Sequence, residues 1–343
     1  MASLCNRRYG QQQVTAWRIA AASDASPFRK DPRIHGGTSM NWSIVAKTPA
    51  MLLAGLLSGA LLAPADTHAG PSDVKALLAQ ALGALGATPS GRLTAGSSSS
   101  QGRAVARTLT QQALAAAPSE AEAHVRLGQV LYEERNFVGA IREFRTAVSL
   151  SPNNAMAYTD LGLALEAQGE VEAAIAAQRT ALALEPFSAP IHSNLADALM
   201  ARGQVQAAIE EYRKAISLQP SFALAHTNLG LTLFETGDLD GAIAEYRKAI
   251  QIQPGAAEAY ANLGNALLAK GDLSGALDAH RHAVSFEPEF ALGHASYGLA
   301  LHAAGQNADA VRELEEALRL ALATGAGGSW VARVQTVLRE IQS

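Results

Sequence analysis

The sequence has little cysteine and few aromatic side chains. Cys5 is the only cysteine among 343 residues, so no internal disulfide can form and a cysteine-based metal site, which needs several ligands, is excluded. Aromatic residues make up 5% of the chain although apolar residues reach 48%, and alanine supplies much of the apolar share. Small apolar side chains favour closely packed helices over a sandwich with large inward-facing residues.

The chain also lacks an excess of basic residues and any catalytic signature. Its formal net charge is −4, which provides no electrostatic footprint for nucleic acid. No GxGxxG motif follows a strand, and GxxxxGK[ST], HExxH and GxSxG are all missing. The sequence therefore predicts no enzyme, no catalytic residues, no metal site and no cofactor.

Residues 40–69 have the order of a secretory signal peptide. Lys47 precedes the uncharged apolar run Met51–Ala63, and small-residue cleavage motifs follow at Ala63–Ala65 and Thr67–Ala69. The run is shorter than the roughly 20 residues that span a bilayer. We therefore expect a secreted, periplasmic protein with no membrane span after signal removal. A buried core helix and a retained membrane anchor are the alternatives.

The residues before this segment do not fit the start of a signal peptide. Signal peptides seldom begin 50 residues into a chain, whereas one starting at Met40 would have a normal shape. Residues 1–39 contain six Lys/Arg against two Asp and show few periodic apolar residues. We expect them to be a disordered, non-native extension. The sequence leaves open whether Met1 or Met40 is the true start, and which cleavage motif is used.

Proline recurs with a period of 34 residues along most of the chain, at Pro118, Pro152, Pro186, Pro220, Pro254 and Pro288. On the same period a Leu-Gly pair recurs, as in Leu229–Gly230, with Ala196 and Tyr297 as exceptions. Alanine recurs at two further positions, represented by Ala242 and Ala249. The position between these alanines holds Phe144, Gln178, Tyr212, Tyr246, His280 and Leu314.

This spacing resembles the tetratricopeptide repeat (TPR), a 34-residue unit with an aromatic, Leu-Gly, Ala, aromatic, Ala and Pro pattern. Six units match, at 121–154, 155–188, 189–222, 223–256, 257–290 and 291–324. The resemblance implies an all-α solenoid in which antiparallel helix pairs stack into a right-handed superhelix. The chain departs from the pattern where His or Tyr replaces the usual Trp and where Leu322 replaces the last Pro.

The residues of the unit that begins at Ala223 support a helical hairpin independently. Gly230 removes a side chain where two helices would approach each other. Gly237 is suited to the left-handed conformation that ends a helix, and Asp238 to capping the next one. Pro254 then stops the second helix. Neither helix can bury its apolar stripe alone, so neighbouring units must stack.

Both edges of the repeat region predict additional helices. Residues 70–120 predict a partial unit with helices over Ser72–Leu85 and Gln101–Pro118, separated by a Gly/Ser-rich insertion that we expect to be a flexible loop. Residues 325–343 predict a terminal capping helix, with Ser329 as its N-cap. One side of that helix carries Trp330, Val334, Val337, Leu338 and Ile341.

The histidines are interpreted as structural. His124, His192, His226 and His294 share one repeat position on the packed face, where an amphipathic ring can fill the aromatic slot. His280 and His282 lie two residues apart on a predicted helix, so their side chains do not face each other and do not easily chelate one ion.

The concave face holds the candidate site. In this repeat family, first-helix positions 2, 6, 9 and 13 line the groove, and position 6 carries three consecutive Asn here. This row resembles the amide ladder of O-linked N-acetylglucosamine transferases, which holds the backbone of an extended peptide. An amide offers both donors and acceptors. The predicted groove consists of Asp160, Asn194, Asn228, Asn262, Asp197, Leu231, Asn265, Met200 and Phe234. Alternatively, each Asn bonds a neighbouring helix or faces water.

The groove composition is amide, apolar and mildly acidic, with one Arg at position 6, Arg126. It lacks the Lys and Arg with which TPR proteins grip a C-terminal carboxylate. The sequence predicts a non-catalytic scaffold of the cell envelope that binds an extended peptide or a partner helix. The alternatives are a regulatory or recruiting subunit of an envelope enzyme complex, such as one making polysaccharide, and a self-assembling oligomer. The partner, the pathway and the oligomeric state are left open.

Overall fold

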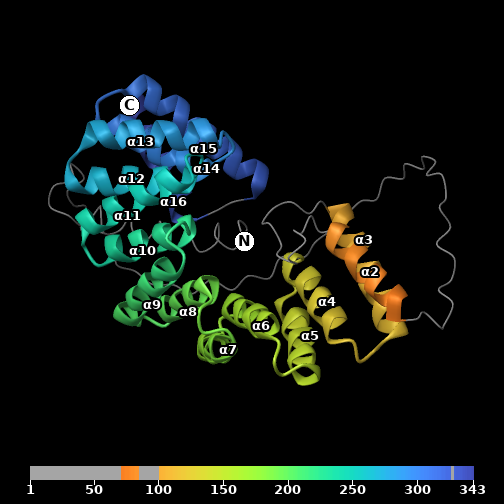
Figure 1. Ribbon diagram of the computed structural model, residues 1–343. Helices are drawn as coiled ribbons and strands as arrows, with labels where there is room; N and C mark the ends of the chain where they lie inside the picture. Colours follow the sequence, from red (N-terminus) through yellow and green to blue (C-terminus); the bar gives the residue numbers. More distant parts are fainter. Residues whose placement is uncertain (1–70, 85–99, 326–327) are drawn as a thin grey trace, which may run out of the picture.

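The computed structural model describes residues 71–84, 100–325 and 328–343, and every regular element within these ranges is an α-helix. Helices that follow one another along the chain pack together as neighbours. Figure 1 shows the array curving from α2 and α3 at one end, through α7 and α8, to α15 at the other. The fold is therefore the α-solenoid that the 34-residue period predicts.

Each repeat unit contributes one helical hairpin. The six hairpins are α4 (Ala121–Glu133) with α5 (Phe137–Leu150), α6 (Ala155–Gln168) with α7 (Val171–Leu184), α8 (Ala189–Ala201) with α9 (Val205–Leu218), α10 (Ala223–Glu235) with α11 (Leu239–Ile252), α12 (Ala257–Lys270) with α13 (Leu273–Phe286), and α14 (Ala291–Ala303) with α15 (Asn307–Thr324). They are flanked by α2 (Pro71–Ala84), α3 (Ser100–Ala116) and α16 (Ser329–Gln342). Every first helix begins at the first residue of its 34-residue unit.

The turn inside a unit follows the local signals in the sequence. Gly237 has a φ of 87°, which is the left-handed region that glycine adopts without strain. Oδ1 of Asp238 accepts a hydrogen bond from the Gly241 amide at 2.9 Å and so caps α11. Helix α11 ends at Ile252, two residues before Pro254. The roles predicted for these residues are confirmed.

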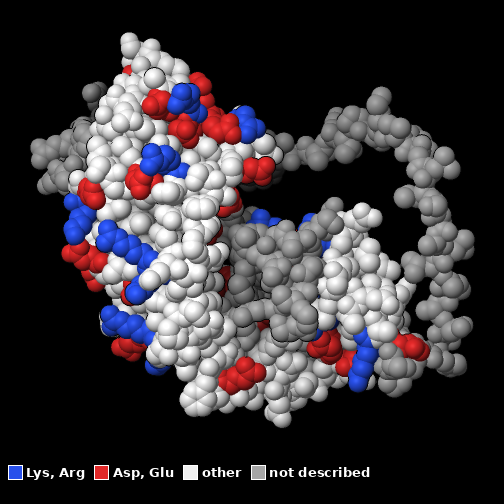
Figure 2. All heavy atoms as spheres, turned by 45° about the horizontal axis from the view of Figure 1, so that its top comes forward, with Lys and Arg blue, Asp and Glu red and all other residues white. Residues whose placement is uncertain are grey.

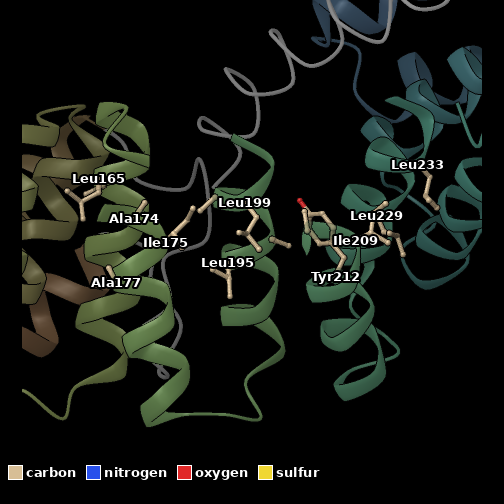
Figure 3. Packing of buried hydrophobic residues seen from close by; sticks show 14 of the residues in the cluster. Leu165, Ala174, Ile175, Ala177, Leu195, Leu199, Ile209, Tyr212, Leu229 and Leu233 are labelled. Atoms are coloured by element: carbon tan, nitrogen blue, oxygen red, sulfur yellow. The ribbon is translucent and has the colours of Figure 1, made fainter. Parts of the chain in front are cut away.

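Buried apolar side chains fill the space between consecutive helices. Figure 3 shows Leu165 of α6, Leu195 of α8 and Leu229 of α10 lying between neighbouring helices in one continuous cluster. That cluster reaches from α4 to α13, so the first five repeat units share one continuous core. Stability therefore comes from the contacts between helices that follow one another.

Glycine at unit position 8 allows the two helices of a hairpin to approach closely. A Cβ atom on Gly230 would lie 2.8 Å from Cε1 of Tyr246. On Gly128 it would lie 2.6 Å from Cε1 of Phe144. Because real Cβ atoms do not come this near another atom, the large side chain of the second helix occupies the space that glycine leaves.

The C-terminal helix corrects one sequence prediction. Helix α16 begins at Ser329, its N-cap is Gly328, and no side chain makes a capping hydrogen bond. The N-cap role predicted for Ser329 is wrong, because Ser329 is already the first helical residue. The apolar side of α16 is present as predicted, since Val334, Val337 and Leu338 are buried in a cluster with residues of α14 and α15.

Several sequence predictions lie outside the described residues: the extension at 1–39, the signal peptide at 40–69 and most of the Gly/Ser-rich insertion. None of the helices in the described ranges combines the length and the apolar character that crossing a bilayer requires. On the face of the molecule shown in Figure 2, acidic and basic side chains alternate along the outer edge.

Candidate functional site

The first helices of the units form the inner side of the curve. Neighbouring first helices contact each other, as α4 does α6, α6 does α8, α10 does α12 and α12 does α14. In the described part of the chain, consecutive second helices do not contact each other to this extent. In a curved stack the more closely spaced helices lie inside, which agrees with the arrangement in Figure 1. The candidate groove therefore lies on the first helices.

Polar side chains connect neighbouring first helices at two junctions. Nε2 of Gln129 donates a hydrogen bond to Oδ2 of Asp160 at 2.8 Å. Nδ2 of Asn228 donates to Oδ1 of Asp197 at 3.1 Å. In both pairs unit position 9 is joined to position 6 of the following unit, 31 residues further along the chain. These amides and carboxylates therefore stabilise the contact between repeats.

Further hydrogen bonds extend the two connections. Arg126 donates from Nη1 to Oε1 of Gln129 at 3.0 Å, which continues the first connection along α4. The hydroxyl of Tyr212 donates to the same Oδ1 of Asp197 that accepts from Asn228. For Asn228 the structure thus shows the neighbouring-helix bond that was the alternative to ligand binding.

The remaining junctions lack such a bond. Leu163 and Leu231 occupy position 9 before Asn194 and Asn262, and a leucine side chain cannot make the bond that position 9 makes at the other two junctions. The side chain of Asn194 makes no hydrogen bond within the described ranges. At the last junction, Nδ2 of Asn265 is buried without a described hydrogen-bond partner.

The same junction holds a second unpartnered group. Oγ of Ser296, at position 6 of the unit that follows Asn265, is buried and makes no hydrogen bond to the described chain. A buried polar atom that lacks a partner costs about 1–3 kcal/mol. Solvent does not reach either atom, so a ligand would recover part of that free energy only after the side chains that cover them shift.

The predicted groove residues lie on α6, α8, α10 and α12. Five are partly exposed: Asp160, Asn194, Asp197, Met200 and Asn228. Four are buried: Leu231, Phe234, Asn262 and Asn265. Phe234 belongs to the main hydrophobic cluster, and Met200 packs against it. Their roles in binding a ligand stay predictions.

Two electrostatic features accompany these residues. Burial raises the pKa of the Glu258 carboxyl, in the first turn of α12, to about 7, and the Glu287 carboxylate acts in the same direction. In the described ranges no group of three or more His, Cys, Asp and Glu side chains is arranged to hold a metal ion.

The sequence interpretation missed a second set of polar contacts at the repeat junctions. The four histidines interpreted as fillers of the aromatic slot each approach a glutamate of the second helix and a backbone carbonyl of the preceding unit. A sequence signal for this set exists, because each of these histidines is followed by Glu 19 residues later.

Two family models, both described as tetratricopeptide repeat, match this chain. One matches residues 100–155, 133–189 and 193–257, and the other matches residues 233–295. Together they cover more than half of the chain. A search of the curated proteins finds no significant match.

Several solved structures are similar to the chain. The Cut9–Hcn1 hetero-tetramer of the APC/C has a TM-score of 0.59 and 19% identity over 71% of this chain and 48% of that one, so the chain spans about half of its length. MamA has a TM-score of 0.43 and 31% identity over 48% of this chain and 95% of MamA. YrrB, described as a TPR protein with an unusual peptide-binding site, has a TM-score of 0.43 and 21% identity over 57% of this chain and 97% of YrrB.

Proposed function

Because the chain belongs to the tetratricopeptide repeat family, we propose that it is a non-catalytic scaffold whose inner face binds an extended segment of another protein. The fold itself suggests a protein–protein interaction scaffold. The observation that carries the proposal is the unused hydrogen-bonding capacity on the first helices. Asn194 makes no side-chain hydrogen bond to the described chain, and Nδ2 of Asn265 is buried without a described partner.

An extended peptide matches this chemistry. Its main chain offers N–H and C=O groups at regular intervals, and one Asn side chain can both donate to and accept from them. Asn194 on α8 and Asn265 on α12 belong to units separated by one further unit, so a bound segment would run along several repeats. The carboxylates of Asp160 and Asp197 on the same face disfavour an acidic guest.

The signal-peptide pattern at 40–69 supports a place in the cell envelope. It combines Lys47, an apolar run and small-residue motifs in the order that the secretion machinery reads. Amino-terminal sequencing of the mature protein tests this part of the proposal. The expected first residue lies near Asp66 or Gly70, and a protein that begins at Met1 or Met40 would contradict export by signal cleavage.

Substitution of the inner-face amides should weaken peptide binding without unfolding the protein. Peptides are first selected against the full chain from a random display library, and their Kd is measured by calorimetry. Asn194→Ala and Asn265→Ala should each raise the Kd about 3- to 10-fold, because one hydrogen bond contributes about 0.5–1.5 kcal/mol. Helicity measured by circular dichroism should stay unchanged.

Two further variants separate binding from folding. Thr180→Ala changes an exposed residue of α7, on a second helix, and should leave the Kd unchanged. Asn228→Ala should lower thermal stability, because Asp197 loses a hydrogen bond from the neighbouring unit. Equal Kd values for Asn194→Ala, Asn265→Ala and Thr180→Ala would contradict the groove role.

A further inference from the structure

Two positions of the repeat change together along the chain. Unit position 4 holds either His or Tyr, and position 23, on the second helix, holds either Glu or Ala. The histidine units pair His124 with Glu143, His192 with Glu211, His226 with Glu245 and His294 with Glu313. The tyrosine units pair Tyr158 with Ala177 and Tyr260 with Ala279. Glutamate is thus present in each unit that has this histidine, and in neither tyrosine unit.

The four histidines make the same two contacts. The distances from Nδ1 to Oε2 of the glutamate are 2.9, 2.6, 2.6 and 2.7 Å in chain order. The distances from Nε2 to a proline carbonyl oxygen are 3.0, 3.1, 3.1 and 3.0 Å. The carbonyls belong to Pro118, Pro186, Pro220 and Pro288, which end the preceding units. Each histidine therefore joins both helices of its unit to the unit before it.

These contacts require two protons on the imidazole ring. A backbone carbonyl only accepts hydrogen bonds, so Nε2 must carry a proton. An ionised carboxylate also only accepts, so Nδ1 must carry one as well. A neutral imidazole has a single N–H and can make only one of the two bonds. The geometry is that of an imidazolium paired with a carboxylate.

The surroundings favour this charged form. Only 9–13% of each histidine side chain is exposed, so solvent screens the pairs little. The hydrogen bond to Glu245 raises the pKa of His226 against the opposing effect of burial, and the Pro220 carbonyl adds to the rise. Burial also opposes the rise for His294, but Glu313 and the Pro288 carbonyl outweigh it and raise the pKa.

Other charged groups face these pairs from the second helices. Arg142 donates to Glu143 from Nε and Nη2, and Lys214 donates to Glu211 at 2.7 Å. Lys248 disfavours the charged form of His226, and Glu316 favours that of His294. Burial opposes ionisation of Glu211, but the hydrogen bonds from Lys214 and His192 hold its pKa below the ordinary value.

We propose that the four His–Glu–Pro contacts, called proton clamps below, make the packing of the repeat units depend on pH, so that the solenoid loosens as the histidines lose their protons. The clamps sit at the junctions before α4, α8, α10 and α14. Because adjacent units hold each other in the fold, a junction that loses a clamp loses contacts between units. The inference is independent of what the inner face binds.

The pH range follows from the sign of the shifts. A raised histidine pKa provides stability that is fully present below the unfolded value of about 6.5 and is lost as pH rises through the higher folded value. At the acidic end the lowered pKa of Glu211 keeps its clamp intact below the ordinary carboxyl range. The hydrogen bonds of the clamps should therefore be intact at mildly acidic pH and break at alkaline pH.

The chain itself supplies a matched replacement for a clamp. The units with Tyr158 and Tyr260 keep the 34-residue geometry without a titratable pair, since their position 23 is a buried alanine. We therefore compare the full chain with a variant in which units three and four carry this alternative, His192→Tyr with Glu211→Ala and His226→Tyr with Glu245→Ala. Both proteins also carry Glu258→Gln, because a carboxyl with a pKa of about 7 would change stability over the same pH range.

Urea unfolding followed by circular dichroism between pH 6.5 and 8.5, above the range in which His280 changes stability, tests the clamps. The folding equilibrium constant of the reference protein should fall with rising pH, by up to about tenfold for each pH unit by which the pKa of His226 or of His294 is raised. The four-residue variant retains two clamps and should show about half of this dependence. An identical pH dependence in the two proteins would overturn the proposal.

A second measurement does not require the four-residue variant to fold. In the reference protein at pH 6.5, ¹⁵N NMR should show both ring nitrogens protonated for His226 and His294, whose pKa values are raised. The assignment is made by single His→Tyr substitutions, each of which removes one set of signals. Rings that carry one proton at pH 6.5 would overturn the proposal even if stability changed with pH.

Discussion

Replacement of Gly230 by leucine should lower the free energy of unfolding by about 3 kcal/mol. A Cβ atom at this position would lie 2.8 Å from Cε1 of Tyr246 and 3.2 Å from the carbonyl oxygen of Ala242. The tyrosine ring is fully buried and the carbonyl belongs to the backbone of α11, so neither moves away easily. The remaining leucine atoms would have to separate the two helices of the hairpin. Chemical denaturation monitored by circular dichroism measures the loss.

Two variants establish that the contact causes the effect. Gly230→Ala should be milder, at about 1 kcal/mol, because Ala196 already occupies the same repeat position opposite Tyr212. Ala176→Leu places the same side chain on an exposed position of α7 and should change stability by no more than about 0.5 kcal/mol. If Gly230→Leu were as stable as Ala176→Leu, the close contact between the helices would be refuted.

Replacement of His280 by phenylalanine should raise the free energy of unfolding by about 2 kcal/mol at pH 7. The imidazole is fully buried, and neither ring nitrogen has a hydrogen-bond partner in the described structure. Phenylalanine removes the unsatisfied N–H and still fills the slot, as Phe144 does at the same repeat position opposite another glycine. The reverse substitution Phe144→His should lower stability by a similar amount, which makes it the matched control.

The gain from His280→Phe should grow as pH falls. Burial lowers the pKa of His280 to about 4, whereas an unfolded histidine titrates near 6.5. Between these values the unfolded chain binds a proton that the folded chain does not, so wild-type stability decreases with acidification. At pH 5 the advantage of the variant should be about 2 kcal/mol larger than at pH 7. A gain that does not change between pH 7 and pH 5 would contradict a buried neutral imidazole.

The pKa of His280 is lowered and that of His226 is raised, so histidine favours different charge states at two places in the same fold. Neither ring nitrogen of His280 has a hydrogen-bond partner among the described residues, and burial lowers the pKa of the ring to about 4, which favours the neutral form. His226 lies between the carboxylate of Glu245 and the carbonyl of Pro220 and favours the charged form. The residue type alone does not show that His280 and His226 differ in charge state. The partners that surround the ring decide which charge state is stable.

The helices could be predicted closely because their signals are local. The proline, the Leu-Gly pair and the two alanines recur at fixed spacing, and each first helix begins at the predicted first residue of its unit. Gly237 acts through its own φ angle, and Asp238 accepts a hydrogen bond from Gly241, which lies only three residues further along the chain. The prediction that Ser329 is an N-cap was wrong, because a hydroxyl residue can also be the first residue within a helix, as Ser329 is here.

The candidate site could be placed on the first helices, but the roles of its amides could not be separated. Asn194 and Asn228 occupy the same repeat position, and each stands between a hydroxyl residue and a leucine. Their difference lies one unit earlier, where Leu163 precedes the first and Asp197 precedes the second. Asp197 lies close enough to accept a hydrogen bond from the Asn228 amide only when the neighbouring units are packed together.

The sequence by itself therefore determined the repeat, the helices and the glycines that let them approach, because these depend on contacts within one 34-residue unit. The tertiary structure decided what the polar side chains do, because their partners lie 19 or 31 residues away and come close only after stacking. The amide of Asn228 is used between units, whereas that of Asn194 makes no hydrogen bond within the described residues. The protons that we propose for the clamp histidines depend on a glutamate of the second helix and on a proline carbonyl in the turn before the first helix, which come together only in the folded chain.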